Sequence, residues 1–185
     1  PDSVGMCVAG IGSNGQVAQA CAGPRKKGSG LGPVDALSLF SIGSITKTFT
    51  ASLLADMVAR GEVQLSDRVQ QYLPASVKIP TRNGREITLL DLATVSSGLP
   101  GMPSNFKPGN PANPYADYTE QDVYAFLKSY ELGRDVGATY EYSNLGMGLL
   151  GIALTHKDGR SYEAMVKARV LDPLSMADTR VALSP

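Results

Sequence analysis

The chain has 185 residues with a hydrophobic content of 43%, and its 17 basic side chains balance 17 acidic ones. This composition is typical of a folded globular protein. No run of five like charges occurs, which argues against a nucleic-acid-binding protein or a polybasic membrane-surface protein. No apolar segment is long enough to cross a bilayer, and the start has neither an initiator methionine nor a signal-like pattern. We therefore expect a processed or trimmed chain whose partner is a small molecule or a peptide.

Two apolar segments near the N-terminus, residues 4–11 and 16–23, predict antiparallel strands joined by the Ser-Asn-Gly turn signal at 13–15. A loop of those three residues places Cys7 opposite Cys21, at a spacing that a disulfide tolerates. A register shift of one residue separates them and leaves two small buried thiols, so both states stay open. A lone hairpin is marginally stable, and its apolar faces need further strands or a covering element.

Helical periodicity predicts five helices after the hairpin, each with recognisable start or stop signals. Thr88 and Thr119 are each followed three residues later by aspartate, the spacing of a capping box, while Asn144 and Ser161 are expected to cap later helices. Gly159 is expected to end the helix that begins at Asn144. The predicted helices run from about residue 44 to 60, 88 to 94, 119 to 130, 144 to 159 and 161 to 170. The proline-rich stretch 101–118 predicts a long surface loop.

Ser44 and Lys47 stand three residues apart at the start of the first predicted helix, so they share a face and lie within hydrogen-bond reach. Apolar neighbours disfavour a charged ammonium, and a neutral amine can take the serine proton. Backbone N–H groups at the helix start suit a developing oxyanion. The same Ser-x-x-Lys spacing recurs at Ser104 and Lys107, inside the proline-rich stretch where nothing holds the two side chains together. A helix-start serine with a lysine that reaches solvent is the structural alternative for Ser44.

Residues 40–50, FSIGSITKTFT, resemble the active-site helix of the serine β-lactamase and penicillin-binding protein family, most closely class C β-lactamases and their esterase and peptidase relatives. Three more segments are similar to that family and occur in its order. Residues 89–100 resemble the family's LLTHTSGLP segment, residues 140–144 its tyrosine-x-asparagine motif, and residues 171–179 its PLGM…T segment. The similarity therefore extends over about residues 35–180, which makes it far more specific than any one motif.

The resemblance implies that Ser44 is acylated and that Lys47 accepts or relays its proton. It implies that Tyr142 is a general base for acylation or for the deacylating water, and that Asn144 donates to the substrate's amide carbonyl. A lysine ammonium beside a phenol favours the phenolate, which agrees with the role of Tyr142. An aromatic staple and an ordinary helix cap are the structural alternatives for Tyr142 and Asn144.

The sequence departs from the family pattern in three places. Val95-Ser96 stands where the family has His-Thr, and Ser175 stands where it has glycine. The third motif, Lys-Thr-Gly or a variant on a sheet strand, has no counterpart among these residues, nor has the family's N-terminal helix. The resemblance implies an α/β (α+β) fold of β-lactamase/transpeptidase type, an antiparallel sheet flanked by helices plus an all-helical region. Residues 1–75 would form the N-terminal part of the α/β domain, and residues 76–185 a mainly helical domain. Later sheet strands are absent, and a second chain or a missing C-terminal segment would complete the sheet.

The leading functional expectation is a serine hydrolase that forms an acyl-enzyme at Ser44, with β-lactam hydrolysis favoured. A D,D-peptidase, a β-lactamase-like carboxylesterase and a non-catalytic ligand-binding module are the alternatives, so the partner is a β-lactam, an ester or a peptidoglycan-like peptide. Two cysteines and the single His156 support no zinc site, and no cofactor is expected. The family resemblance implies a periplasmic or secreted bacterial protein.

Overall fold

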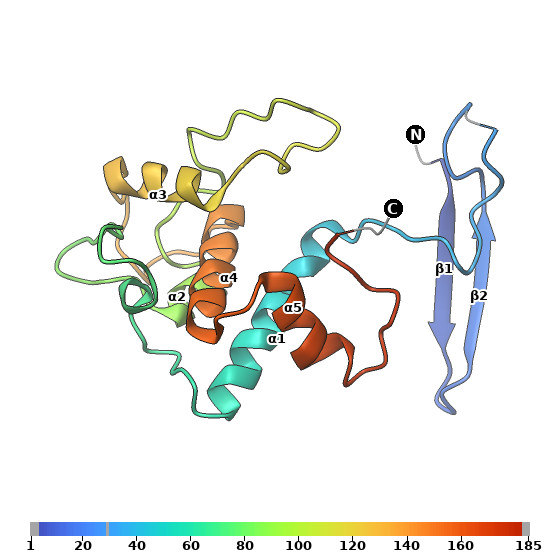
Figure 1. Cartoon of the computed structure of the whole chain (residues 1–185), viewed down its shortest axis with the longest axis horizontal. Coiled ribbons are helices and arrows are strands. Elements are labelled where there is room, and N and C mark those ends of the chain that lie inside the picture. The colour runs from blue at the N-terminus through green and yellow to red at the C-terminus, as the bar shows by residue number, and fades with distance from the viewer. Residues whose placement is uncertain (1–3, 29, 183–185) are drawn as a thin grey trace. The chain divides into compact units, whose positions relative to one another are not determined.

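The computed structural model describes residues 4–28 and 30–182, and these divide into two compact units between Ile42 and Gly43. The first unit holds a β-hairpin and the loop that follows it, and the second holds the helices (Figure 1). The boundary near residue 75 that we expect from the sequence concerns the domains of the family fold, and it stays a prediction.

The N-terminal unit is built on strands β1 (Met6–Ile11) and β2 (Val17–Ala22), which pair antiparallel. Cys7 stands opposite Cys21 in this ladder, and a disulfide joins them with a Cα–Cα distance of 4.1 Å. Of the two states that the sequence left open, the observed strand register therefore gives the disulfide and not two separate thiols. Large apolar side chains on both strands are exposed within the described chain, Ile11 to 77%. The hairpin thus presents an apolar surface to its surroundings.

The helical unit contains the five predicted α-helices, with shorter turns between them. In chain order its elements are η1 (Gly43–Ile45), α1 (Thr46–Ala59), η2 (Val69–Tyr72), α2 (Leu89–Ala93), α3 (Glu120–Ser129), α4 (Asn144–Asp158), α5 (Tyr162–Val166) and η3 (Lys167–Leu171). Residues 101–118 form turns and bends, as the prolines predict. The first α-helix begins at Thr46 rather than near Ser44, because Gly43–Ile45 forms a 3-10 turn ahead of it.

Side-chain caps mark the starts of four helices. One of them is the predicted cap of α5, Ser161, whose side chain accepts a hydrogen bond from Ala164 N. Thr88 and Thr119 each form a capping box with the aspartate three residues later, which confirms the starts predicted for α2 and α3. The cap of α4 is not Asn144, as the sequence suggested, but Ser143, whose Oγ accepts a hydrogen bond of 2.8 Å from Gly146 N. A serine oxygen suits this position equally well, so local spacing does not distinguish the two residues. The consequence is that the Asn144 side chain is available for other contacts.

Helix α4 lies at the centre of the helical unit and contacts α1, α2, α3 and α5 (Figure 1). Leu149, Leu150 and Leu154 on this helix have no solvent-accessible surface, and burying each leucine is worth about 1.5–3 kcal/mol. The helix ends as predicted at Gly159, whose φ of 83° is a left-handed conformation that glycine adopts without strain. The core therefore holds α4 firmly, together with Asn144 at its first residue.

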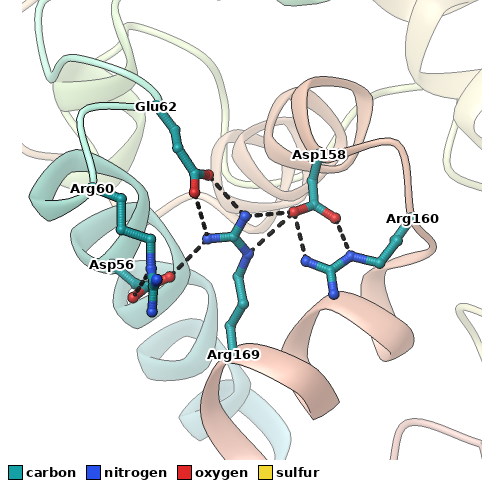
Figure 2. A network of polar contacts seen from close by, with 6 residues as sticks. All are labelled: Asp56, Arg60, Glu62, Asp158, Arg160 and Arg169. Carbon is teal, nitrogen blue, oxygen red and sulfur yellow. Dashed lines mark hydrogen bonds and ion pairs between the residues drawn. The ribbon is translucent and has the colours of Figure 1, made fainter.

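A network of ion pairs joins the far end of α4 to its neighbours (Figure 2). Arg169 of η3 bonds Asp56 of α1 at 2.8 Å, Glu62 at 2.8 Å and Asp158, the last residue of α4, at 2.7 Å. Arg160 adds a second contact to Asp158 at 2.5 Å. The side chains of Arg169 and Asp158 are 13% and 2% exposed. Removing one partner from such a pair leaves a poorly solvated charge, so the loss of a single member is expected to destabilise this end of the helical unit.

Candidate active site

Ser44 lies in the 3-10 turn η1, immediately before helix α1, and its side chain is exposed to solvent. Gly43 precedes it with a φ of 51°, a conformation that favours glycine, and a Cβ at this position would meet open space. The turn presents the Ser44 hydroxyl at the surface of the helical unit. The sequence predicted Ser44 at the start of the first helix, and the structure places it in the 3-10 turn just before that helix.

Lys47 lies one turn further along and reaches back to the serine, as the spacing predicts. Its Nζ donates to Ser44 Oγ at 3.0 Å and to Asn144 Oδ1 at 2.7 Å. The same Nζ lies 4.5 Å from the centroid of the Tyr142 ring, within range of a cation–π interaction. The immediate contacts of this half-buried lysine are therefore polar or aromatic, in place of the aliphatic surroundings that the sequence suggested.

Tyr142 lies just before helix α4 and completes a triangle with Ser44 and Lys47. Its hydroxyl donates to Ser44 Oγ at 2.5 Å. Hydrogen bonding to Lys47 and Ser44 lowers the pKa of Tyr142 from its usual value, because both interactions favour the phenolate. Ser44 Oγ thus accepts from both neighbours, and its own proton can leave once either of them becomes an acceptor.

Asn144, the first residue of α4, has its amide orientation set by Lys47. Because a lysine ammonium can only donate, the contact of 2.7 Å assigns Oδ1 to the lysine side. Nδ2 consequently points the other way and lies 3.3 Å from Met102 Sδ. A thioether is a weak acceptor, so a carbonyl oxygen could readily replace it at this donor.

The segment that carries Tyr142 and Asn144 is held by residues 95–101. Glu141 N donates to Val95 O at 2.9 Å, and Asn144 N donates to Gly101 O at 2.9 Å. Between them, the buried Ser143 donates its hydroxyl to Pro100 O at 2.6 Å. These bonds hold both functional side chains against the family-like segment 89–100.

Val95 and Ser143 act as positioning residues, a role that the sequence did not assign to either of them. Val95 has a φ of 50°, which a β-branched residue adopts with strain. It replaces the family's histidine, and its carbonyl anchors the residue before Tyr142. Ser143 could have been found because serine is itself a preferred N-cap residue, so it competes with Asn144 for the cap of α4.

His156 lies in the last turn of α4, and its Nε2 lies 2.8 Å from Glu120 Oε1. Within residues 4–28 and 30–182, no group of three or more histidine, cysteine, aspartate or glutamate side chains is arranged to hold a metal ion. No helix in the same ranges is both long and apolar enough to cross a membrane.

A family model described as "Beta-lactamase" matches residues 1–185. The D-alanyl-D-alanine-carboxypeptidase/endopeptidase AmpH of Escherichia coli K12 is 33% identical over 150 residues, which are 80% of this chain and 38% of that protein. The chain thus spans well under half of this curated relative.

Solved structures match over nearly the whole chain. A β-lactamase/D-alanine carboxypeptidase from Yersinia pestis, crystallised with citrate, is 26% identical with a TM-score of 0.84, covering 97% of this chain and 50% of that one. A class C β-lactamase is 28% identical with a TM-score of 0.79, covering 98% of this chain and 46% of that one. These likenesses confirm the β-lactamase/transpeptidase-like fold expected from the sequence, of which this chain carries a part.

Proposed function

The chain belongs to the β-lactamase family, and we propose that it is a serine hydrolase that forms an acyl-enzyme at Ser44. One observation carries the proposal: Ser44 Oγ accepts hydrogen bonds from both Lys47 Nζ at 3.0 Å and Tyr142 OH at 2.5 Å. A nucleophile within reach of a base that is itself oriented by a third group is the arrangement that covalent catalysis requires.

In acylation, Ser44 Oγ attacks the carbonyl carbon of an amide while its proton passes to the Tyr142 phenolate. The lowered pKa of Tyr142 makes that phenolate more accessible near neutral pH. The lysine ammonium stabilises the phenolate, and the proton then goes to the departing nitrogen as the carbon–nitrogen bond breaks. In deacylation, Tyr142 takes a proton from water and the hydroxide oxygen bonds to the acyl carbon. The ester bond to Ser44 Oγ then breaks as Tyr142 returns its proton to that oxygen. Asn144 Nδ2 would donate to the substrate's amide carbonyl in place of Met102 Sδ.

β-Lactam hydrolysis of the class C type is the activity that we propose first. The second candidate is a D,D-peptidase, favoured because AmpH and the Yersinia pestis protein both carry carboxypeptidase in their names. In both cases we place the protein in the bacterial periplasm or outside the cell, where the Cys7–Cys21 disulfide persists. The wall with the second oxyanion donor would come from a further segment or a second chain, because these residues contain no Lys-Thr-Gly-like motif.

Incubation with a chromogenic cephalosporin and a fluorescent penicillin, followed by turnover assays and intact mass, tests this proposal. Rapid turnover identifies a β-lactamase, and a persistent adduct on Ser44 identifies a D,D-peptidase. Cleavage of a short nitrophenyl ester alone would identify an esterase. Ser44→Ala should abolish every reaction, whereas Ser104→Ala, in the other Ser-x-x-Lys match, should abolish none. Activity that survives Ser44→Ala would refute the assignment, and binding without any turnover or adduct would indicate a non-catalytic module.

A further inference from the structure

A cleft of ≈ 820 Å³ extends from the candidate active site along helix α4. Lys47 and Asn144 line one end of it, and Glu120 and His156 line the other. His156 stands twelve positions after Asn144 on the helix, which at 1.5 Å per residue corresponds to roughly 18 Å. A peptide in extended conformation covers that length with about five residues. The cleft is therefore longer than a bicyclic β-lactam nucleus needs.

The floor of the cleft contains Gly148, a glycine in the middle of α4. A Cβ at this position would meet no atom within 4 Å, so neighbouring protein does not require the absence of a side chain here. Glycine in a helix interior is less stable than alanine by about 1 kcal/mol. The open backbone at Gly148 leaves room for a ligand to lie along the helix.

The far end of the cleft carries the carboxylate of Glu120. Tyr124 OH donates to Glu120 Oε1, and His156 Nε2 lies 2.8 Å from the same oxygen. Partial burial raises the pKa of Glu120, but the hydrogen bonds from Tyr124 and His156 outweigh it and lower the pKa overall. No hydrogen bond from the described residues reaches the other oxygen, Oε2, and the side chain is 40% exposed. Glu120 is thus an oriented anion with one oxygen available.

The arginine at this end of the cleft, Arg160, does not pair with Glu120. Arg160 also lines the cleft, but both of its contacts, at 2.5 and 2.8 Å, go to Asp158. The end of the cleft that lies away from Lys47 therefore favours a positively charged ligand group over a negatively charged one.

We propose that this cleft binds an extended peptide substrate with an ammonium group about five residues from the bond that Ser44 attacks, and that Glu120 selects this group. The inference rests on the proposed function and adds the substrate class: a cationic peptide rather than a small neutral amide. Catalysis takes place at Ser44, and Glu120 determines specificity.

Two peptidyl nitrophenyl esters test the proposal in the full-length protein, identical except for a lysine or an acetyl-lysine about five residues from the ester. The lysine ester should have a kcat/KM about fivefold higher, the effect of a partly exposed ion pair. Glu120→Gln should abolish this preference. Glu131→Gln removes the same charge from an exposed residue that does not line the cleft, and it should leave the preference intact. Equal rates for the two esters in the wild-type protein would overturn the proposal.

Binding separates this proposal from the proposed function. The two labelled peptides, as non-cleavable amides, are titrated against the Ser44→Ala variant and followed by fluorescence anisotropy. The Ser44→Ala variant should bind the lysine peptide preferentially, and the Ser44→Ala, Glu120→Gln double variant should lose this preference. That result supports peptide binding in the cleft even if no ester is hydrolysed. Turnover of a small ester without any such preference leaves the serine hydrolase standing and refutes the cleft.

Gly148→Leu tests whether the cleft is open in the full-length protein. If it is open, the substitution should leave the melting temperature unchanged or raise it, while lowering kcat/KM for the long lysine ester at least tenfold more than for a short acetyl ester. A lower melting temperature would show that polypeptide fills this space, and the proposal would be wrong.

Discussion

Asp158→Asn is expected to lower the free energy of unfolding at neutral pH, and this difference from the wild type should disappear in acid. The buried carboxylate lies at the junction of α4 and η3 and bonds both Arg160 and Arg169 (Figure 2). Asparagine keeps its size and shape but removes its charge. Arg169 retains Asp56 and Glu62 as partners, so the substitution tests the Asp158 charge with little other change.

The pKa of Asp158 sets the magnitude. Hydrogen bonds from Arg160, together with Arg169 and against the effect of burial, lower this pKa from 3.8 to about 2. Each unit is worth 1.36 kcal/mol, so the ionised carboxylate contributes about 2 kcal/mol to the free energy of unfolding. Since the folded pKa lies below the unfolded one, this contribution is complete above pH 4. It decreases to about half near pH 3 and is nearly lost at pH 2.

Urea unfolding followed by circular dichroism at pH 7, 5 and 3 measures this difference between wild type and variant. At pH 7 the variant should be less stable by about 2 kcal/mol, a fall of about 4–8 °C in melting temperature for a chain of this size. Asp172→Asn removes an exposed partner of Lys167 and should change stability by about 1 kcal/mol at most. A difference between wild type and Asp158→Asn that stays constant from pH 7 to pH 3 would refute the electrostatic explanation.

Two further predictions concern the candidate active site. Tyr142→Phe keeps the ring beside Lys47 but should lower kcat by about 10²–10⁴-fold. Hydrogen bonding to Lys47 and Ser44 lowers the pKa of Tyr142, so the wild-type kcat/KM should begin to fall only at a pH below the pKa of a free phenol. This acidic fall in the pH profile should be absent from the Tyr142→Phe variant. Ser143→Ala should lower stability by about 1 kcal/mol and also lower kcat, because it releases both the cap of α4 and the bond to Pro100 O. Thr88→Ala, which removes the cap of α2, should cost similar stability with kcat unchanged; equal kcat losses in the two cap variants would contradict the positioning role of Ser143.

The predictions that succeeded from the sequence depend on residues close together in the chain. The helix starts at Thr88 and Thr119 follow from a side chain and a backbone group three residues apart. The end of α4 at Gly159 follows from one residue's conformational freedom. The approach of Lys47 to Ser44 likewise needs a single helical turn. Such features are readable because their partners occur at fixed local spacings.

Local spacing did not decide between competing partners. Both Ser143 and Asn144 could cap α4, and the choice depends on Pro100 O, which lies 43 residues away and binds the serine. The pairing of Cys7 with Cys21 depends on strand register, which only the assembled ladder specifies. The exposure of Ser44 depends on the 3-10 turn at Gly43–Ile45, whereas the sequence predicted that the α-helix already begins near residue 44.

The sequence by itself determined the helices, most of their caps and the Ser-x-x-Lys pair, and the order of its motifs led to the family. The tertiary structure decided what faces that pair. Asn144 reaches Lys47 across 97 residues and Tyr142 reaches Ser44 across 98. The cleft beside them is lined by α1, α3, α4 and α5 together. Periodicity reports which face of one helix is apolar, but the distance between two helices is set by the packing of the core between them, which no local pattern contains.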